Sequence, residues 1–209
     1  MGDGSFFSND ARNRFRARLQ PYAAGIARLG LTPNMLTLIG FGIAIVAAVA
    51  AGLQWWVAAG LVSVAGGAFD MFDGAVARAT GTASKFGAFV DSTFDRWGEG
   101  TVYVGVAAGS VAAGEPLAAL LATLALNSAV MVSYTRARAE VLGFTGEVGV
   151  APRPERIVIL GAGLVASGLA GGPGGSPWLQ LALGALFVLT SITVIQRIVH
   201  VRRQAAQQQ

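Results

Sequence analysis

Long apolar runs constrain the fold of this chain more than any other feature of its sequence. Runs of about 20 predominantly apolar residues, enough to cross a hydrocarbon core of roughly 30 Å as an α-helix, recur along the chain. Hydrophobic residues make up 54% of the sequence and charged residues only 12%, about half the charged fraction of a typical soluble domain. We therefore predict an all-α integral membrane protein rather than a soluble one.

Turn and helix-start signals divide this apolar sequence into six predicted transmembrane helices. Thr32-Pro33-Asn34 precedes the first span, Thr80-Gly81-Thr82 separates the second from the third, and a run rich in Gly and Pro at 171–177 precedes the last. The predicted spans are 34–53, 55–78, 85–111, 116–140, 154–170 and 177–199. Neither a second domain nor a short-period repeat is visible in the sequence.

The N-terminal segment is basic and amphipathic. Between residues 15 and 29 its apolar residues recur at spacings of three and four, while arginines occupy much of the remaining surface. It has neither the apolar core nor the small-residue cleavage site of a signal peptide. We therefore predict an N-terminal juxtamembrane amphipathic helix that lies in the membrane interface. A basic tail without fixed structure is the alternative.

The basic residues favour this topology because they gather on one side of it. All 15 Lys and Arg residues fall in the N-terminal arm, in the 2–3 and 4–5 connections with the span ends beside them, or at the C-terminus. The opposite loops contain one charged residue, Glu115. The positive-inside rule therefore places both termini and the charged face in the cytoplasm of a multi-pass cell-membrane protein. We expect the lipid bilayer, and no nucleic acid, as partner. Residues 1–209 then form one membrane domain: an interfacial arm (1–31), a six-helix bundle (32–200) and a tail (201–209).

Four aspartates stand close together in this apolar chain. Asp70 and Asp73 are three residues apart near the end of the second span, and Asp91 and Asp95 are four apart near the start of the third, so each pair shares a helix face. Four uncompensated carboxylates at the membrane surface would repel one another and lose hydration. Oxygen ligands without His or Cys suit hard cations such as Mg²⁺ or Mn²⁺. We therefore predict a divalent-metal site.

A structural role for the aspartates is the alternative. They could cap helices or pair with basic residues of the same segment, namely Arg78, Lys85 and Arg96. Such roles account for one or two carboxylates, but not for two same-face pairs on either side of a turn that contains glycine. The sequence has no cysteine and a single histidine, so Cys-based and multi-His metal sites are excluded.

The same aspartates carry a family motif. The pattern Asp70-x-x-Asp73-Gly74-x-x-Ala77-Arg78, eight further residues and then Gly87-x-x-x-Asp91-x-x-x-Asp95 resembles the signature of the CDP-alcohol phosphatidyltransferases at every defined position. Members of that family cleave a CDP-linked lipid or alcohol, transfer its phosphoryl group to a second alcohol and release CMP. The resemblance extends to the juxtamembrane helix and the six-span layout. It implies a homodimer and two Mg²⁺ ions per active site, with Mn²⁺ as the alternative.

The resemblance also implies roles for individual residues. Asp70 and Asp91 would each contact both metal ions, Asp73 would complete one site and Asp95 the other. Asp95 would also be the catalytic general base that takes the proton from the attacking hydroxyl. The implied CDP-lipid contacts are Thr32, Pro33, Asn34, Met35, Gly74, Arg78 and Ser84. Without the resemblance, the segment from Thr32 to Met35 is typical of a helix start.

Arginines gather at the ends of the fourth, fifth and sixth spans, on the side of the predicted metal site. Such a set beside a metal centre indicates a phosphate group on the acceptor alcohol. Within the family, these segments resemble the enzymes that use inositol phosphate, the bacterial phosphatidylinositol phosphate synthases and their archaeal ether-lipid counterparts. Arg136 stands where the actinobacterial enzymes typically have lysine. The predicted acceptor-phosphate contacts are Ser133, Arg136, Arg138, Arg153, Arg156 and Arg197.

Several alternatives stay open at this point. Glycerol 3-phosphate could be the acceptor, which would give phosphatidylglycerol phosphate. The lipid substrate could be CDP-diacylglycerol or an ether analogue. A divalent-cation transporter is a different class of function, but it would be expected to place ionisable groups near the membrane midplane and to show inverted repeats. Glu99, four residues after Asp95, could support the site or could be only an intrahelical neighbour.

Overall fold

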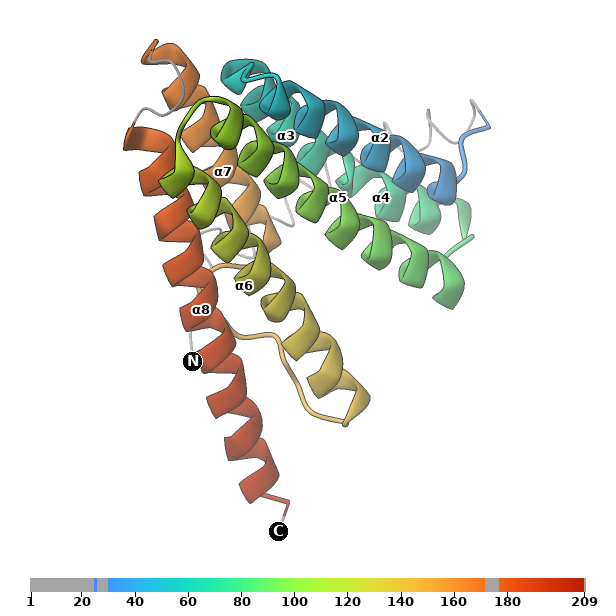
Figure 1. The fold of residues 1–209 in the computed structure, drawn as a ribbon. Helices are drawn as coiled ribbons and strands as arrows, with labels where there is room; N and C mark the ends of the chain where they lie inside the picture. The colour runs from blue at the N-terminus through green and yellow to red at the C-terminus, as the bar shows by residue number, and fades with distance from the viewer. Residues whose placement is uncertain (1–24, 26–29, 172–176, 209) are drawn as a thin grey trace.

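The structure is a computed structural model that describes residue 25, residues 30–171 and residues 177–208 (Figure 1). The side chains of Met71, Asp73 and Ala79 lie outside this description, and so does nearly all of the predicted interfacial helix. The described part of the chain is all-helical and contains no strand. Its helices are α2 (Pro33–Gly52), α3 (Trp56–Phe69), α4 (Met71–Thr80), α5 (Lys85–Ala112), α6 (Pro116–Val141), α7 (Arg153–Leu169) and α8 (Pro177–Ala206).

The helices follow the predicted spans closely, with two differences. Helix α8 continues to Ala206, beyond the predicted end of the last span at 199 and through most of the predicted tail. The predicted second span is divided at Asp70, where α3 ends and α4 begins. The backbone of Asp70 stays in the right-handed helical region, at φ −57° and ψ −17°. Its N–H still donates to the carbonyl of Gly66 at 3.0 Å. The break is therefore local, and it places Asp70 at the junction of two helices instead of inside one.

Four of the described helical segments are long and apolar enough to cross a membrane. They are Pro33–Gly52, Trp56–Arg78 (which joins α3 and α4), Pro116–Val141 and Pro177–Ala206. The other two predicted spans correspond to α5 and α7. Helix α5 carries Asp91, Asp95 and Glu99, and α7 is 17 residues long with a charged first turn. The two helices outside the apolar set thus carry charged residues of the candidate site, among them Asp95 on α5 and Arg153 on α7.

The helices pack in pairs around a core of small and aliphatic side chains. The closest associations are α2 with α5, α6 with α8, and α3 with α7. Figure 1 shows α2 beside α5, and α6 beside α8. Helices α6 and α8 extend beyond α7, toward the end of the picture where the C-terminus lies. The α6–α7 loop is tied to the far end of α8, because Thr145 N–H donates to Gln204 Oε1 and Gln204 Nε2 donates to the Thr145 carbonyl, both at 2.9 Å.

Glycines allow α5 to lie directly against α2. A Cβ atom added at Gly105 would collide with the backbone of Ala48, and one added at Gly109 would collide with the carbonyl oxygen of Ala51. Neither obstacle is a flexible side chain, so the two helices would have to separate to accept a methyl group. Close backbone approach through small residues is a common way to pack helices in membranes. It fixes the position of α5 relative to α2.

We expect Gly105→Ala to destabilise the protein. Overpacking of this kind costs about 1–3 kcal/mol, because the contact opens along the whole α2–α5 interface. Thermal unfolding of the detergent-solubilised protein measures the effect. The matched control is Gly184→Ala on α8, where an added Cβ meets nothing within 4 Å. Equal unfolding temperatures for the two variants would contradict the proposed role of Gly105 in packing.

Candidate active site

A cleft opens where the start of α2, helix α4 and the start of α5 meet. Its volume is about 390 Å³, within the range of small-molecule pockets. Asp91 of the acidic motif also lines it. Met35 is not part of the lining and is exposed. The predicted CDP-lipid contacts that line the cleft are Thr32, Pro33, Asn34, Gly74, Arg78 and Ser84.

Two helix N-termini are built into this cleft. The hydroxyl of Thr32 accepts from Met35 N–H at 3.3 Å and caps α2, and the hydroxyl of Ser84 accepts from Gly87 N–H at 3.0 Å and caps α5. The first turn of a helix presents free N–H groups and the positive end of the helix dipole. The helix-start interpretation of Thr32 is therefore confirmed. The same geometry suits a cleft that accepts anionic groups.

Glycines bring the polar side chains of the cleft close together. A Cβ at Gly87 would lie 3.1 Å from Ser84 Oγ and 3.6 Å from Asn34 Oδ1, so this glycine leaves room for polar atoms from both α2 and α5. A Cβ at Gly74 would lie 3.3 Å from Arg78 Nη1, so the guanidinium passes close over that glycine. Gly81 ends α4 with φ +66° in the left-handed region, which permits the short turn into α5.

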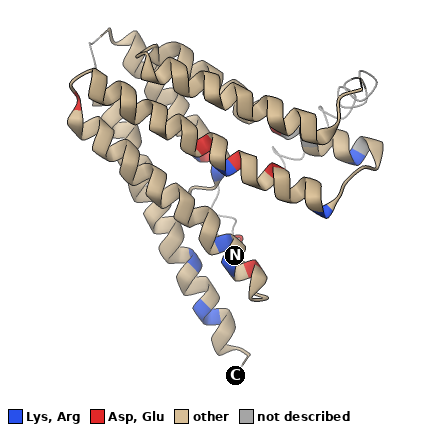
Figure 2. Ribbon diagram, turned by 45° about the vertical axis from the view of Figure 1, so that its right-hand side comes forward, with Lys and Arg blue, Asp and Glu red and all other residues tan. Residues whose placement is uncertain are grey.

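A second pocket lies between α2, α3, α5 and α7, and Asp70 and Asp95 line it. Arg153 of α7 bridges these two carboxylates. Its Nη2 lies 2.7 Å from Asp70 Oδ2 and its Nη1 lies 2.8 Å from Asp95 Oδ2. Figure 2 shows acidic and basic segments meeting near the middle of the bundle. Arg153, predicted as an acceptor-phosphate contact, therefore lies directly beside two of the predicted metal ligands.

The aspartates provide a suitable but incompletely described donor set for a divalent metal. Asp70 and Asp95 converge on one positive group, the Arg153 guanidinium, and all their donor atoms are hard oxygens of the kind that Mg²⁺ and Mn²⁺ prefer. Among the described side chains, no group of three or more carboxylates or other ligands is close enough to hold one ion. The side chain of Asp73 lies outside the described residues. The donor chemistry of Asp70 and Asp95 therefore fits a site for a hard divalent cation.

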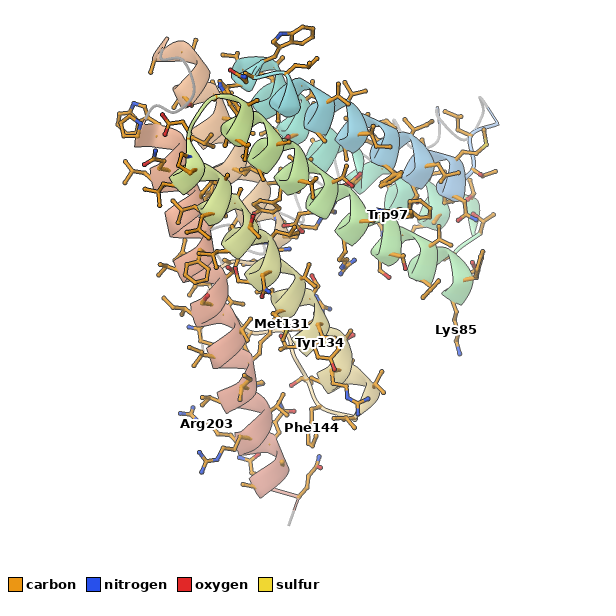
Figure 3. The ribbon with its side chains drawn as sticks, in the orientation of Figure 1. Lys85, Trp97, Met131, Tyr134, Phe144 and Arg203 are labelled. Carbon is orange, nitrogen blue, oxygen red and sulfur yellow. The ribbon has the colours of Figure 1, made fainter. Side chains whose placement is uncertain are left out.

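The alternative partners of the aspartates contribute little in comparison. Arg96 Nη1 is 3.7 Å from Asp95 Oδ2, and the same nitrogen donates to the Ser92 carbonyl at 2.7 Å. Figure 3 shows Lys85 pointing away from the bundle at the first residue of α5. Arg78 lines the cleft of α2, α4 and α5 instead. The principal basic partner of Asp70 and Asp95 therefore comes from α7, far away in the sequence.

A buried ion pair lies one helical turn deeper. Arg156 Nε and Nη2 donate to the two carboxylate oxygens of Glu99, each at 2.7 Å. The side chains are 2% and 9% exposed, respectively. Arg156 Nη1 also donates to the Ala151 carbonyl at 3.2 Å. Glu99 therefore supports the site from α5 across to α7 and is more than an intrahelical neighbour. A buried, bidentate pair of this kind fixes the register of the two helices.

The remaining predicted acceptor contacts differ strongly in accessibility. Arg197 is buried, where its Nε donates to the Val148 carbonyl at 2.9 Å and its Nη1 donates to the Val132 carbonyl. Arg136 is 43% exposed and pairs with Glu140 and Glu147 at 2.8 and 2.6 Å. Arg138 is exposed, and Ser133 is half-buried with its hydroxyl donating to the Ala129 carbonyl at 3.4 Å. The structure thus places Arg156 and Arg197 inside the bundle and Arg136 and Arg138 on its surface.

Two residues that the sequence analysis did not select also belong to the site. Thr37 of α2 lines both the cleft and the inner pocket, so it lies where the two meet. Gly40, one turn further along α2, lies against Asp70. Neither residue belongs to the acidic motif. Thr37 and Gly40 are three residues apart and therefore share a face of α2. That face could have been selected from the sequence only if the helix packed against it had been known.

Known proteins resemble the chain over most of its length. A sequence model of the CDP-alcohol phosphatidyltransferases matches residues 30–191. The archaetidylinositol phosphate synthase of Pyrococcus horikoshii is 36% identical over 194 residues, which cover 92% of this chain and 95% of that protein. The phosphatidylinositol phosphate synthase of Mycolicibacterium smegmatis is 38% identical over 190 residues, which cover 88% of this chain and 83% of that protein.

Solved structures agree with these matches. The phosphatidylinositol phosphate synthase of Mycobacterium tuberculosis with CDP-DAG bound has a TM-score of 0.78 and 32% identity, over 87% of this chain and 92% of that one. The same enzyme in complex with manganese and citrate has a TM-score of 0.79 and 32% identity, over 87% of this chain and 88% of that one. Sequence motif, family match and fold agree, and the chain belongs to the CDP-alcohol phosphatidyltransferase family of enzymes.

Proposed function

We propose that this enzyme transfers the phosphatidyl group of CDP-diacylglycerol, or of an ether analogue, to a hydroxyl of inositol phosphate and releases CMP. One observation carries the proposal. The cleft lined by the predicted CDP contacts also contains Asp91, and Thr37 joins it to the pocket of Asp70 and Asp95. Relatives that are 36% and 38% identical over most of the chain are named as synthases of inositol-phosphate lipids.

The proposed topology has six transmembrane helices, an interfacial N-terminal helix, and both termini and the active site in the cytoplasm. The one-sided placement of all 15 basic residues supports it. Helices α5 and α7 complete the six because each packs along its length against a helix that is apolar enough to span the membrane: α5 against α2 and α7 against α3. Asp95 and Glu99 of α5 and Arg153 and Arg156 of α7 then face the protein interior, as ionisable groups in membranes usually do.

The proposed cofactor is a pair of Mg²⁺ ions, with Mn²⁺ as the alternative. The residues that would hold them are Asp70, Asp73, Asp91 and Asp95. When bound, two such ions would neutralise the charge of the CDP-lipid pyrophosphate and would stabilise the attacking oxygen of the acceptor alcohol and the leaving oxygen of CMP. The structure of the similar Mycobacterium tuberculosis enzyme with manganese supports the use of a divalent metal.

The protein's own residues would bind the CDP moiety and move one proton. The capped N-termini of α2 and α5, together with Arg78, would bind the phosphates of the CDP-lipid, and Gly74 would let the nucleotide approach α4. Asp95 would accept the proton of the acceptor hydroxyl. Arg153, at 2.8 Å from Asp95, would keep that carboxylate oriented in the pocket.

The proposed phosphate-binding residues of the acceptor site are the six predicted from the sequence. The exposed side chains of Arg136 and Arg138 would make the first contacts. Arg153 would bring positive charge next to Asp95, with Ser133 as a further polar contact. The buried Arg197 would add positive potential, and Arg156 and Arg197 would both hold the α6–α7 loop in place through hydrogen bonds to its carbonyls. Phosphate on the acceptor would thereby be favoured over a neutral alcohol.

A substrate panel tests the proposed function. Purified protein in detergent receives CDP-diacylglycerol, a divalent metal and one of three acceptors: inositol phosphate, free inositol or glycerol 3-phosphate. We expect a phosphatidylinositol phosphate product by mass spectrometry and metal-dependent release of CMP. Product from glycerol 3-phosphate alone would assign the enzyme to phosphatidylglycerol phosphate synthesis. In a parallel assay with the protein in lipid vesicles, metal movement across the membrane without release of CMP would instead indicate a transporter.

We expect Arg136→Gln and Arg138→Gln to weaken acceptor binding selectively. Charge-assisted hydrogen bonds contribute roughly 1.5–3 kcal/mol each, so the KM for inositol phosphate should rise about 10- to 100-fold. The KM for CDP-lipid should change little, because neither arginine lines the CDP cleft. The carboxylate partners of Arg136 are exposed, and such pairs contribute little to stability, so the fold should survive the substitution.

Arg203→Gln is the control for this pair of variants. Figure 3 shows Arg203 pointing outward from α8, near the C-terminus, and it carries the same charge as Arg136. Its replacement should leave both KM values unchanged. Steady-state kinetics with each substrate varied in turn measures all three variants. If Arg203→Gln raised the acceptor KM as much as Arg136→Gln, general surface charge rather than specific phosphate contacts would be responsible.

A further inference from the structure

Gly40 of α2 lies directly against the carboxylate of Asp70. A Cβ atom added at Gly40 would lie 2.5 Å from Asp70 Oδ1, closer than real Cβ atoms approach an oxygen. The other carboxylate oxygen, Oδ2, is 2.7 Å from Arg153 Nη2. The carboxylate is therefore held between the bare backbone of α2 on one side and a guanidinium from α7 on the other. Any side chain at position 40 would compete with it for space.

The backbone of Asp70 has little freedom to move away. Its preceding turn on α3 is packed on both sides: a Cβ at Gly66 would lie 3.0 Å from Ile43 Cγ2 of α2, and one at Gly67 would lie 2.8 Å from Ile157 Cδ1 of α7. The end of α3 is thus confined between two helices. A methyl group at position 40 would therefore act mainly on the carboxylate, which would have to rotate.

The backbone conformation of α2 does not require a glycine at position 40. Gly40 is inside a regular helix and is not among the described residues with positive φ. Glycine in a helix interior lowers stability relative to alanine. Gly42, two residues further along the same helix, has nothing within 4 Å of an added Cβ. The two glycines lie in the same helix, but only Gly40 faces a neighbouring side chain. The contact with Asp70 therefore distinguishes Gly40 from Gly42.

We propose that Gly40 is a positioning residue for the metal-binding function of Asp70. By leaving the space beside Oδ1 empty, it sets the orientation in which this carboxylate can contact cations on its Oδ2 side. The inference rests on the proposed metal-dependent function, because it assigns Asp70 as a ligand. It does not involve the CDP cleft, since Gly40 lines only the inner pocket.

Metal binding by Gly40→Ala and Gly42→Ala tests the proposal. The free Mn²⁺ signal in electron paramagnetic resonance reports binding by the full-length protein in detergent, without any substrate. We expect Gly40→Ala to weaken Mn²⁺ binding about 10- to 100-fold, the usual effect of losing a residue that orients a metal ligand. The metal concentration for half-maximal CMP release should rise in parallel, and excess metal should restore part of the activity. Gly42→Ala should match the wild type in both measurements.

A stability cycle covers the case in which Gly40→Ala folds poorly. The cycle compares the thermal unfolding of wild type, Gly40→Ala, Asp70→Ala and the double variant, all without metal. Because Asp70→Ala removes the carboxylate, Gly40→Ala should lower the unfolding temperature of the wild type but not that of Asp70→Ala. The same loss in both backgrounds would show that Gly40 packs against something other than this carboxylate, and would overturn the proposal.

The outcomes separate this proposal from the proposed function. If Gly40→Ala bound Mn²⁺ and released CMP like the wild type, Gly40 would have no positioning role and the enzymatic function would stand. If wild-type protein bound Mn²⁺ but released no CMP with any acceptor, the proposed function would fail and the stability cycle would still report on Gly40 and Asp70.

Discussion

Asp91→Asn should abolish CMP release while leaving a folded, membrane-inserted protein. The substitution removes an anionic ligand but keeps nearly the same side-chain volume, so the half-buried position beside the cleft stays filled. A ligand proposed to contact both metal ions stabilises transition-state charge by several kcal/mol, which corresponds to a loss of about 10³-fold or more in turnover. Asp70→Asn should have an effect of the same size for the same reason.

The control for this prediction is Glu115→Gln. Glu115 is the single charged residue of the opposite loops and accepts a hydrogen bond from Gln180 Nε2 at 3.0 Å, which a glutamine can also accept. It undergoes the same change from acid to amide at the other end of the bundle. Turnover by Glu115→Gln should match the wild type. Near wild-type turnover by Asp91→Asn at low Mg²⁺ would contradict the assignment of a shared metal ligand.

Most of the predicted CDP-lipid contacts line one cleft, and the local structure around them depends on residues that are close in sequence. Thr32 and Ser84 cap the two helices that the sequence predicts to start beside them, and both line the cleft with Gly74 and Arg78. Capping and turn formation depend on a few consecutive residues, so these features can be read from spacing alone. The order of the helices and most of their boundaries follow in the same way from apolar runs and turn signals.

The partners of the buried charges could not be predicted from spacing. Arg153 meets Asp70 from 83 positions away, and Arg156 meets Glu99 from 57 positions away. These contacts depend on how α7 is rotated and how far it is shifted along α3 and α5. The sequence analysis assigned both arginines to the acceptor phosphate because they share one end of the bundle. Their contacts with carboxylates add a role in holding α5 and α7 together.

The division of the second span at Asp70 has a similar explanation. Hydropathy predicts one continuous helix, since the residues on either side of Asp70 are apolar or small. The structure breaks the helix at Asp70, one turn after Gly66 and Gly67, where α3 packs closely against both α2 and α7. Gly40 was missed for the same reason, because its importance lies entirely in a contact with another helix.

Asp95→Asn should retain CDP-lipid binding and lose transfer. Asp95 lines the inner pocket and is not among the residues that line the CDP cleft, so the cleft should remain intact. The variant would keep three of the four proposed metal ligands. Arg153 would still have Asp70 at 2.7 Å, so its charge would not be left unpaired. The amide cannot accept the proton of the acceptor hydroxyl, and the loss of a general base costs typically 10²- to 10⁴-fold in rate.

Two measurements on Asp95→Asn distinguish a role of Asp95 as general base from a role as metal ligand only. Equilibrium binding of a CDP-lipid at saturating Mg²⁺ should be close to that of the wild type, whereas kcat should fall by about 10² or more at saturating concentrations of both substrates. Arg96→Gln serves as the control, because Arg96 is the next residue on α5, is exposed, and lies 3.7 Å from the Asp95 carboxylate. It should change neither quantity. A variant of Asp95 that bound CDP-lipid poorly but transferred at the normal rate when saturated would show that Asp95 acts only as a ligand, and the proton would then need another acceptor in the pocket.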